Sequence, residues 1–119
     1  MQKNILNNKL IEIFKQKVYF IHLSYDSSFI ATLNLNNASK KVQTKTRLTF
    51  DQKYLGNDLY IFFEDKESQM YFLYPHDILL YRLSILANFK NTSSWKDKGI
   101  YHWPRLSNIQ KLELFNYKL

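Results

Sequence analysis

The most restrictive feature of the chain is a run of three strand-like segments between residues 18 and 48. Residues 18–25 are almost all β-branched, aromatic or apolar, as expected of a strand that is covered on both faces. Residues 29–36 and 40–48 instead alternate apolar with polar side chains, and turn-forming residues at 36–39 join them into a hairpin. We therefore expect a fold that is built around a β-sheet.

The segments on either side of this run predict a helix and a second hairpin. Residues 4–17 carry apolar side chains at helical spacing, which predicts an amphipathic helix before the first strand. Residues 50–57 are expected to form a polar loop. Residues 58–64 and 69–74 are then expected to pair around the charged turn at 65–68, which adds two strands to the sheet.

Two further helices are predicted after Pro75, which ends the second hairpin. Apolar residues follow helical spacing from Ile78 to Phe89, and residues 100–103 are expected to be extended. A final helix is expected to begin at the capping box that Ser107 and Gln110 form. Its predicted apolar side consists of Ile109, Leu112 and Phe115.

Length and composition predict one domain over residues 1–119, of the α/β (α+β) class. The expected order is α-βββ-ββ-α-α, a mixed central sheet of about five strands flanked by helices. The chain has no cysteine, which excludes disulfides and thiolate metal sites, and its two glycines are too few for a phosphate-binding Gly-rich loop. No apolar run is long enough to span a membrane, so we expect a soluble, cytoplasmic protein.

The chain is strongly basic, with 17 Lys and Arg against 10 Asp and Glu and a net charge of +7. The charge is densest between residues 40 and 53, where five basic side chains accompany one acidic one, Asp51. Such a segment suits a nucleic-acid backbone, so we predict nucleic-acid binding by Lys40, Lys41, Arg47 and Lys53. The alternative is a solvated face whose lysines reflect base bias in the gene.

The third predicted strand carries the pattern that is richest in chemistry. Because strand side chains alternate, Gln43, Lys45 and Arg47 are expected to project from one face. A turn between the first two strands can bring Asp26 beside Gln43, so that two oxygen ligands and an ammonium meet. Such a group can hold a divalent cation and stabilise a charged transition state. The ordinary alternatives are a solvated strand face and a turn in which Asp26 binds its own backbone.

Two other groups of residues have weaker patterns. The histidines at 22, 76 and 102 lie in separate predicted elements, which argues against a zinc site, and His76 is expected to help start a helix. Residues 101–105 combine aromatic and basic side chains that can stack on bases, although packing in the core explains them as well.

On the third strand the sequence resembles the PD-(D/E)xK nuclease superfamily, which includes restriction and repair endonucleases and Holliday-junction resolvases. In that superfamily an acidic residue opens the second core strand, and a (Glu/Asp/Gln)-x-Lys tripeptide follows on the third. Residues 43–45 match this tripeptide in its glutamine form, within a stretch at 42–49 that is similar to small bacterial proteins of this type. Further segments match in order along most of the chain, at residues 54–61, 74–77, 95, 99–101 and 106–107.

This resemblance implies a restriction endonuclease-like core with Asp26, Gln43 and Lys45 as catalytic residues and Mg²⁺ held by Asp26 and Gln43. The sequence departs from the family at the metal site, because Ser28 stands where the acidic residue normally precedes the apolar start of the strand. Asp26 lies two places earlier, and Glu12 on the first helix is the other nearby carboxylate. The motif is therefore degenerate, unless Asp26 reaches the site through a different turn.

Three functions follow from these observations. The first is a Mg²⁺-dependent endonuclease, in which Lys45 activates water and Arg47 grips phosphate. The second is a nucleic-acid-binding module on the same fold that has lost its metal, and the third is a protein-interaction subunit. The expected partner is nucleic acid, with DNA favoured and a membrane excluded. A homodimer is also expected, since small nucleases pair to cut two strands, with the aromatic C-terminal segment as its interface.

Overall fold

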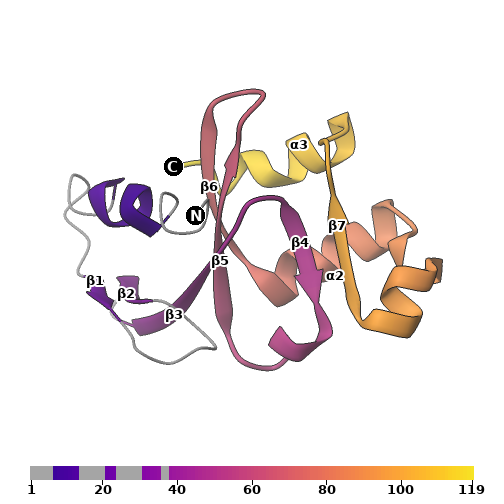
Figure 1. Ribbon diagram of the computed structural model, residues 1–119, viewed down its shortest axis with the longest axis horizontal. Helices are drawn as coiled ribbons and strands as arrows, with labels where there is room; N and C mark the ends of the chain where they lie inside the picture. Colours follow the sequence, from indigo (N-terminus) through magenta and orange to yellow (C-terminus); the bar gives the residue numbers. More distant parts are fainter. Residues whose placement is uncertain (1–6, 14–20, 24–30, 36–37) are drawn as a thin grey trace.

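We describe the protein from a computed structural model, which describes residues 7–13, 21–23, 31–35 and 38–119 (Figure 1). Five strands form the main sheet in the spatial order β1-β2-β3-β5-β6. All neighbouring strands in it are antiparallel except β3 and β5, which are parallel, so the sheet is mixed as predicted. The strands are β1 (Ile21–Leu23), β2 (Ala31–Leu35), β3 (Ala38–Lys45), β5 (Leu59–Asp65) and β6 (Met70–Pro75).

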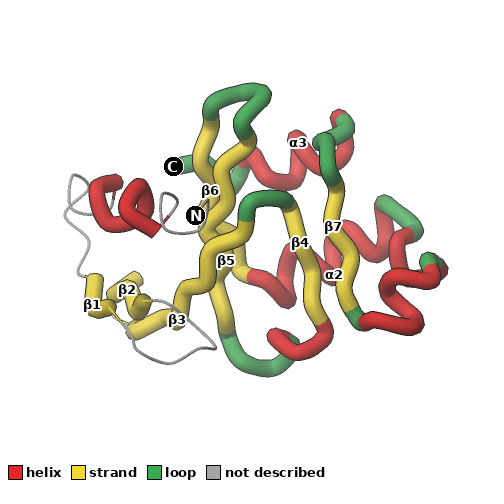
Figure 2. Tube along the Cα trace, viewed as in Figure 1, coloured by secondary structure: helices red, strands yellow, loops and turns green. Residues whose placement is uncertain are grey.

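A second, two-stranded sheet lies beside the main one (Figure 2). It pairs β4 (Leu48–Asp51) with β7 (Ile100–Trp103), antiparallel, with Leu48 opposite Trp103. The expectation of one continuous strand over residues 40–48 is therefore wrong, because β3 ends at Lys45, a bend follows, and β4 leaves the main sheet. All four residues of β4 are buried, and this burial is what holds the strand against the core.

Helices cover both faces of the main sheet. Residues 7–13 are helical, within the helix predicted at 4–17, and α2 (His76–Leu86) begins directly after Pro75 as predicted. The last helix, α3 (Asn108–Phe115), opens with the predicted capping box, in which the Ser107 backbone N–H donates to Gln110 Oε1 at 2.7 Å. Three short helical turns complete the described part: η1 (Gln52–Tyr54), η2 (Phe89–Asn91) and η3 (Ser94–Lys98).

The main hydrophobic core lies between one face of the sheet and the layer that α2, α3, β4 and β7 form. Tyr74 is fully buried there, and its hydroxyl donates to the Thr49 carbonyl at 3.0 Å, which ties β6 to β4. The opposite face carries a smaller core, in which Leu10 of the first helix packs with Val42, Phe62 and Leu73. The side chains of β3 therefore point alternately into two different layers.

The apolar side predicted for α3 is wrong. Ile109, Leu112 and Phe115 are exposed, whereas Gln110 and Leu114 are the buried residues of this helix. The capping interaction holds Gln110 on the inner side, so the helix turns its longer apolar stripe outward. Ile78 and Leu86 of α2 are likewise exposed, while Leu79 and Leu83 are buried as expected.

Candidate active site

Gln43 and Lys45 lie on the face of β3 that is turned toward the main core. In the parallel register with β5, Gln43 is opposite Ile61 and Lys45 is opposite Phe63, both of which belong to that core. The intervening Thr44 points the other way, where its hydroxyl donates to Asn7 Oδ1 at 2.6 Å. The alternation predicted from the sequence thus brings Gln43 and Lys45 to one side of the strand.

The side chain of Gln43 is buried, with 6% of its surface exposed. Its Oε1 accepts the Thr44 backbone N–H at 3.0 Å. A solvated strand face does not explain a buried amide, because burying a polar side chain costs free energy unless its hydrogen bonds are made. The solvated-face alternative is therefore wrong for Gln43.

Lys45 is half-buried at the end of β3, with its ammonium against an aromatic ring. Its Nζ lies 5.3 Å from the centroid of the Tyr54 ring, and Lys53 Nζ lies at the same distance from that ring. Burial lowers the pKa of the Lys45 ammonium, Lys53 lowers it further, and Asp51 acts in the opposite direction. A lysine with a lowered pKa releases its proton more readily than a solvated lysine does. A side chain that takes up and releases a proton during a reaction needs such a pKa.

Asp51 supplies a buried negative charge beneath these two lysines, with 4% of its surface exposed. Its Oδ1 accepts the Lys53 backbone N–H at 3.0 Å, and its Oδ2 lies 3.6 Å from Lys53 Nζ. The carboxylate therefore caps η1 and holds the segment that carries Lys53 and Tyr54 beside the end of β3.

His76 is fully buried and joins this corner to the start of α2. Its Nε2 accepts the Asp51 backbone N–H at 3.0 Å, so the ring proton is on Nδ1, which donates to Asp77 Oδ1 at 2.8 Å. The other oxygen of Asp77 accepts the Gly56 N–H at 2.9 Å, where Gly56 has a φ of 77°. His76 and Asp77 thus anchor the β4–η1 corner, and with it the surroundings of Lys45.

The sequence identified part of this group of residues. Gln43 and Lys45 were predicted as site residues, and His76 was predicted to start a helix, as it does. The sequence marks Asp51 only as the single acid of a basic segment, and it carries no separate signal for Tyr54. The sequence signals the surroundings of Lys45 through the two segments at 54–61 and 74–77 that resemble small bacterial proteins. In the structure these two segments contact each other, through Gly56 with Asp77 and Tyr54 with His76.

The stability of the protein is expected to fall as the pH drops below about 6.5, by up to about 1.4 kcal/mol per pH unit from His76 alone. Burial lowers the pKa of the imidazole below its ordinary value, against the hydrogen bond to Asp77. Between the two pKa values the unfolded chain binds a proton that the folded chain does not, so acid favours unfolding. Urea denaturation at a series of pH values measures this slope.

His76→Gln is the matched variant for this measurement, since it retains an acceptor for the Asp51 N–H but does not titrate in this range. The variant is expected to have a shallower slope between pH 6.5 and the lower pKa of the folded histidine. Equal slopes in the two proteins would contradict the assignment.

The predicted row of Gln43, Lys45 and Arg47 does not form. Arg47 lies in the bend after β3, is exposed, and places Nη1 2.9 Å from His102 Nε2 on β7. The bend redirects the chain toward the second sheet, so the alternation of β3 no longer determines where Arg47 points. Lys40 pairs with Asp58 at 2.5 Å, Lys53 pairs with Asp51 at 3.6 Å, and Lys41 and Lys53 are exposed.

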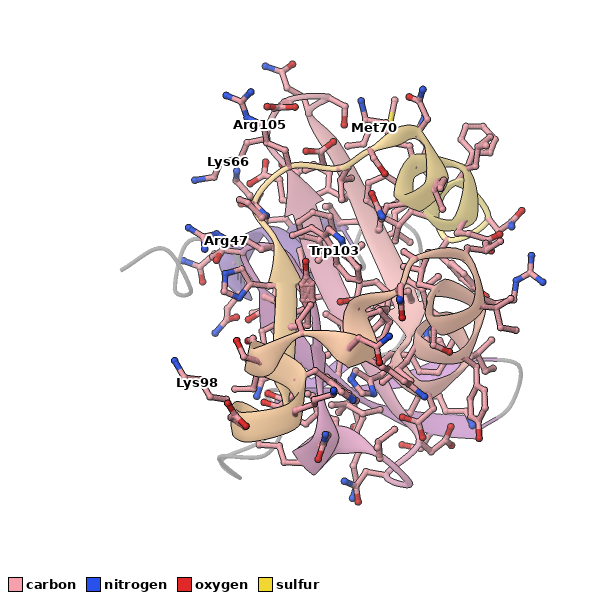
Figure 3. All side chains as sticks on the ribbon, turned by 90° about the vertical axis from the view of Figure 1, so that its right-hand side faces the viewer. Arg47, Lys66, Met70, Lys98, Trp103 and Arg105 are labelled. Atoms are coloured by element: carbon pink, nitrogen blue, oxygen red, sulfur yellow. The ribbon has the colours of Figure 1, made fainter. Side chains whose placement is uncertain are left out.

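Figure 3 shows a basic edge of the molecule, which we define as Arg47, Lys66, Lys98 and Arg105. These four side chains come from the bend after β3, the β5–β6 turn, η3 and the segment after β7. A cavity of about 260 Å³ lies within this edge, and its lining combines Arg47 and Lys66 with three acidic side chains, Glu64, Asp65 and Glu67. Arg105 Nε lies 3.4 Å from Glu67 Oε1, so part of this charge is paired.

The predicted metal ligands are divided between described and undescribed parts of the chain. Gln43 is described, whereas Asp26 lies outside the described residues, and its role stays a prediction. Glu12 is exposed on the helix that covers the opposite face of the sheet. Among the residues that the structure describes, no three His, Asp or Glu side chains gather into a group that could hold a metal ion. None of the described helices has the length and apolar character to cross a membrane.

The fold of this chain is similar to that of a bacterial homing endonuclease, I-Ssp6803I, whose solved structure matches with a TM-score of 0.56 and 14% sequence identity. The match covers 98% of this chain and 84% of that chain. Neither a protein-family model nor a curated protein sequence matches the chain. At this identity the similarity concerns the fold, and the function has to be argued from the site.

Proposed function

We propose that this protein is a metal-dependent DNA endonuclease of the PD-(D/E)xK type. The observation that carries the proposal is the pairing of a buried Gln43 with a half-buried Lys45 of lowered pKa, side by side on β3 of a nuclease-like fold. A buried amide and a desolvated ammonium are costly to maintain, so their presence on one strand face favours a role in chemistry.

The proposed site would hold Mg²⁺ through the side chains of Asp26 and Gln43. The described part fits this role only in part, since Gln43 contributes one neutral oxygen ligand and a carboxylate has to come from Asp26. The chemistry supplied by the bound ion would be neutralisation of the charge on the scissile phosphate. In the proposed reaction Lys45, the last residue of β3, orients the attacking water and takes its proton, or stabilises the extra charge on the phosphate.

DNA would be held through phosphate contacts along the basic edge. Arg47 would reach phosphate from the bend directly after β3, and Lys41 and Lys53 offer two further exposed cations. Lys40 contributes less, because Asp58 already pairs with its ammonium. The net charge of +7 supports rapid, salt-dependent association with a polyanion.

A nucleic-acid-binding module without cleavage activity is the second candidate. The observation that favours it is Ser28, which replaces the expected acidic ligand before the apolar start of the strand. In that case the basic edge is retained while the metal is lost, so DNA would bind without being cut.

One experiment separates these candidates. The purified protein is incubated with supercoiled plasmid in Mg²⁺, in Mn²⁺ and in EDTA, and binding to a labelled duplex is measured by fluorescence anisotropy over a salt series. Conversion of the plasmid to nicked or linear DNA in metal but not in EDTA supports the endonuclease. Binding that weakens steeply with salt but leaves the plasmid intact supports the binding module. Absence of binding at low salt contradicts both.

A further inference from the structure

The outer faces of α2 and α3 carry an unusual amount of exposed apolar surface. Of the eight large apolar side chains that are exposed in the described part of the chain, seven belong to these two helices, with exposed fractions between 43% and 79%. We call them the helical apolar face, and they are Ile78, Tyr81, Ile85, Leu86, Ile109, Leu112 and Phe115.

The two helices that carry these side chains adjoin each other. Arg82 of α2 and Glu113 of α3 form a two-pronged ion pair, with distances of 2.9 and 3.2 Å, which joins the helices side by side. Lys90 Nζ lies 5.7 Å from the centroid of the Tyr81 ring, and Lys118 Nζ lies 6.0 Å from the centroid of the Phe115 ring. Each of the two aromatic rings of the helical apolar face therefore has a lysine against it.

The size of the helical apolar face matches one half of a stable interface. Taking about 150–250 Å² for a large side chain, the exposed parts of the seven residues amount to roughly 800 Å². The largest apolar patch on a monomeric protein is usually about 300–600 Å², whereas each partner in a standard interface contributes about 800 Å². A surface of this size costs free energy for as long as it stays in water.

The size of the helical apolar face favours a second copy of the same chain as the partner. Two copies that bury this face against each other would each contribute about the area that one partner adds to a standard interface. The charged side chains of α2 and α3 are Asp77, Arg82, Lys111 and Glu113, which sum to zero, whereas Lys90 and Lys118 add positive charge beside the face. In a two-fold contact the same surface of both copies meets, so each copy covers the apolar side chains of the other.

The contact would leave the basic edge open. In Figure 3 the helices α2 and α3 form one side of the molecule, and Arg47, Lys66, Lys98 and Arg105 lie along the other. We propose that two copies of this chain associate through their helical apolar faces, around a two-fold axis, with both basic edges pointing outward.

Sedimentation equilibrium tests this association on the full chain. The native protein is expected to reach twice its monomer mass of 14.4 kDa with rising concentration. The double variant Ile85→Glu/Leu112→Glu is expected to raise the dissociation constant by about 100-fold or more, since it places charges on two of the most exposed apolar positions. Leu55→Glu, at an exposed leucine outside the two helices, is the matched control and should leave the association unchanged.

Cross-linking provides a second measurement that does not disturb the apolar side chains. Because the chain has no cysteine, Lys111→Cys on α3 and Lys98→Cys on the basic edge each introduce a single thiol. A short bis-maleimide is expected to link Lys111→Cys into dimers and to leave Lys98→Cys monomeric. A native protein that stays monomeric at every concentration would overturn the proposal, and a different partner would then have to cover the face. A dimer that survives Ile85→Glu/Leu112→Glu, or that cross-links through Lys98→Cys alone, would overturn it as well.

Discussion

In the proposed endonuclease, replacing Lys45 with methionine is expected to slow DNA cleavage by about 10²–10³-fold, because one positioned charge at the reacting phosphate would be worth that much. Methionine keeps the length of the side chain and can pack against the Tyr54 ring, so the fold should change little. Single-turnover cleavage of supercoiled plasmid, with protein in excess, measures the rate of the chemical step.

Lys53→Met is the matched control for this prediction. The ammonium groups of Lys53 and Lys45 lie at the same distance from the Tyr54 ring. The Lys53 side chain is exposed, however, and Lys53 lies in η1, whereas Lys45 is the last residue of β3. Its loss is expected to slow cleavage by less than about tenfold, mainly through weaker phosphate binding. Equal losses of cleavage rate in the two variants would show that Lys45 contributes only to the overall positive potential and does not act directly in the reaction.

Phe50→Ala is expected to lower the free energy of unfolding by about 3–5 kcal/mol, a large part of the 5–15 kcal/mol that is typical of a single domain. The Phe50 side chain is fully buried on β4. Its ring centroid lies 5.7 Å from that of His76, 5.4 Å from that of Phe89 and 5.5 Å from that of Trp103. Removing the ring leaves a cavity between the second sheet and α2 that a close-packed core cannot fill.

Urea denaturation, followed by tryptophan fluorescence, measures this loss. Leu55→Ala is the control on the same segment, and because Leu55 is exposed its replacement is expected to cost less than about 0.5 kcal/mol. A cost below about 1.5 kcal/mol for Phe50→Ala would mean that the second sheet can close over the gap, contrary to the packing of its four buried residues.

The local elements could be predicted because their signals are local. The β5–β6 hairpin follows from two apolar runs around a charged turn, and Pro75 and the Ser107–Gln110 capping box mark the starts of α2 and α3. The break between β3 and β4 carries no such signal, since neither glycine nor proline marks it and the alternation continues from Thr44 through Leu48. What separates the two strands is the pairing of β4 with β7, some fifty residues later in the chain, which no local pattern contains.

The orientation of α3 could not be predicted for a different reason. Helical spacing indicates which side chains of a helix form an apolar stripe. The stripe can be taken as the buried side only if the other side of the helix is polar. In α3 the inner side needs only Leu114 and the capping Gln110, so Ile109, Leu112 and Phe115 are left outside. The same failure at Ile78 and Leu86 of α2 is what identifies the helical apolar face.

The candidate site was predicted in its strand but not in its surroundings. Gln43 and Lys45 share a face because strands alternate, as predicted, whereas Arg47, predicted on the same face, lies in the bend after β3. The surroundings of Lys45 come from Asp51 of β4, Tyr54 of η1 and His76 of α2, which meet through tertiary contacts. Asp26 lies outside the described residues, so its place beside Gln43 stays a prediction.

The opposite placement of the basic edge and the helical apolar face limits what a symmetric pair could do with DNA. Two subunits joined back to back would direct their basic edges away from each other. Such a pair would not grip both backbones of one double helix at a single position, as a scissor-like dimer does. It would instead tether two separate helical segments and nick one backbone in each, so a double-strand break would require two independent encounters.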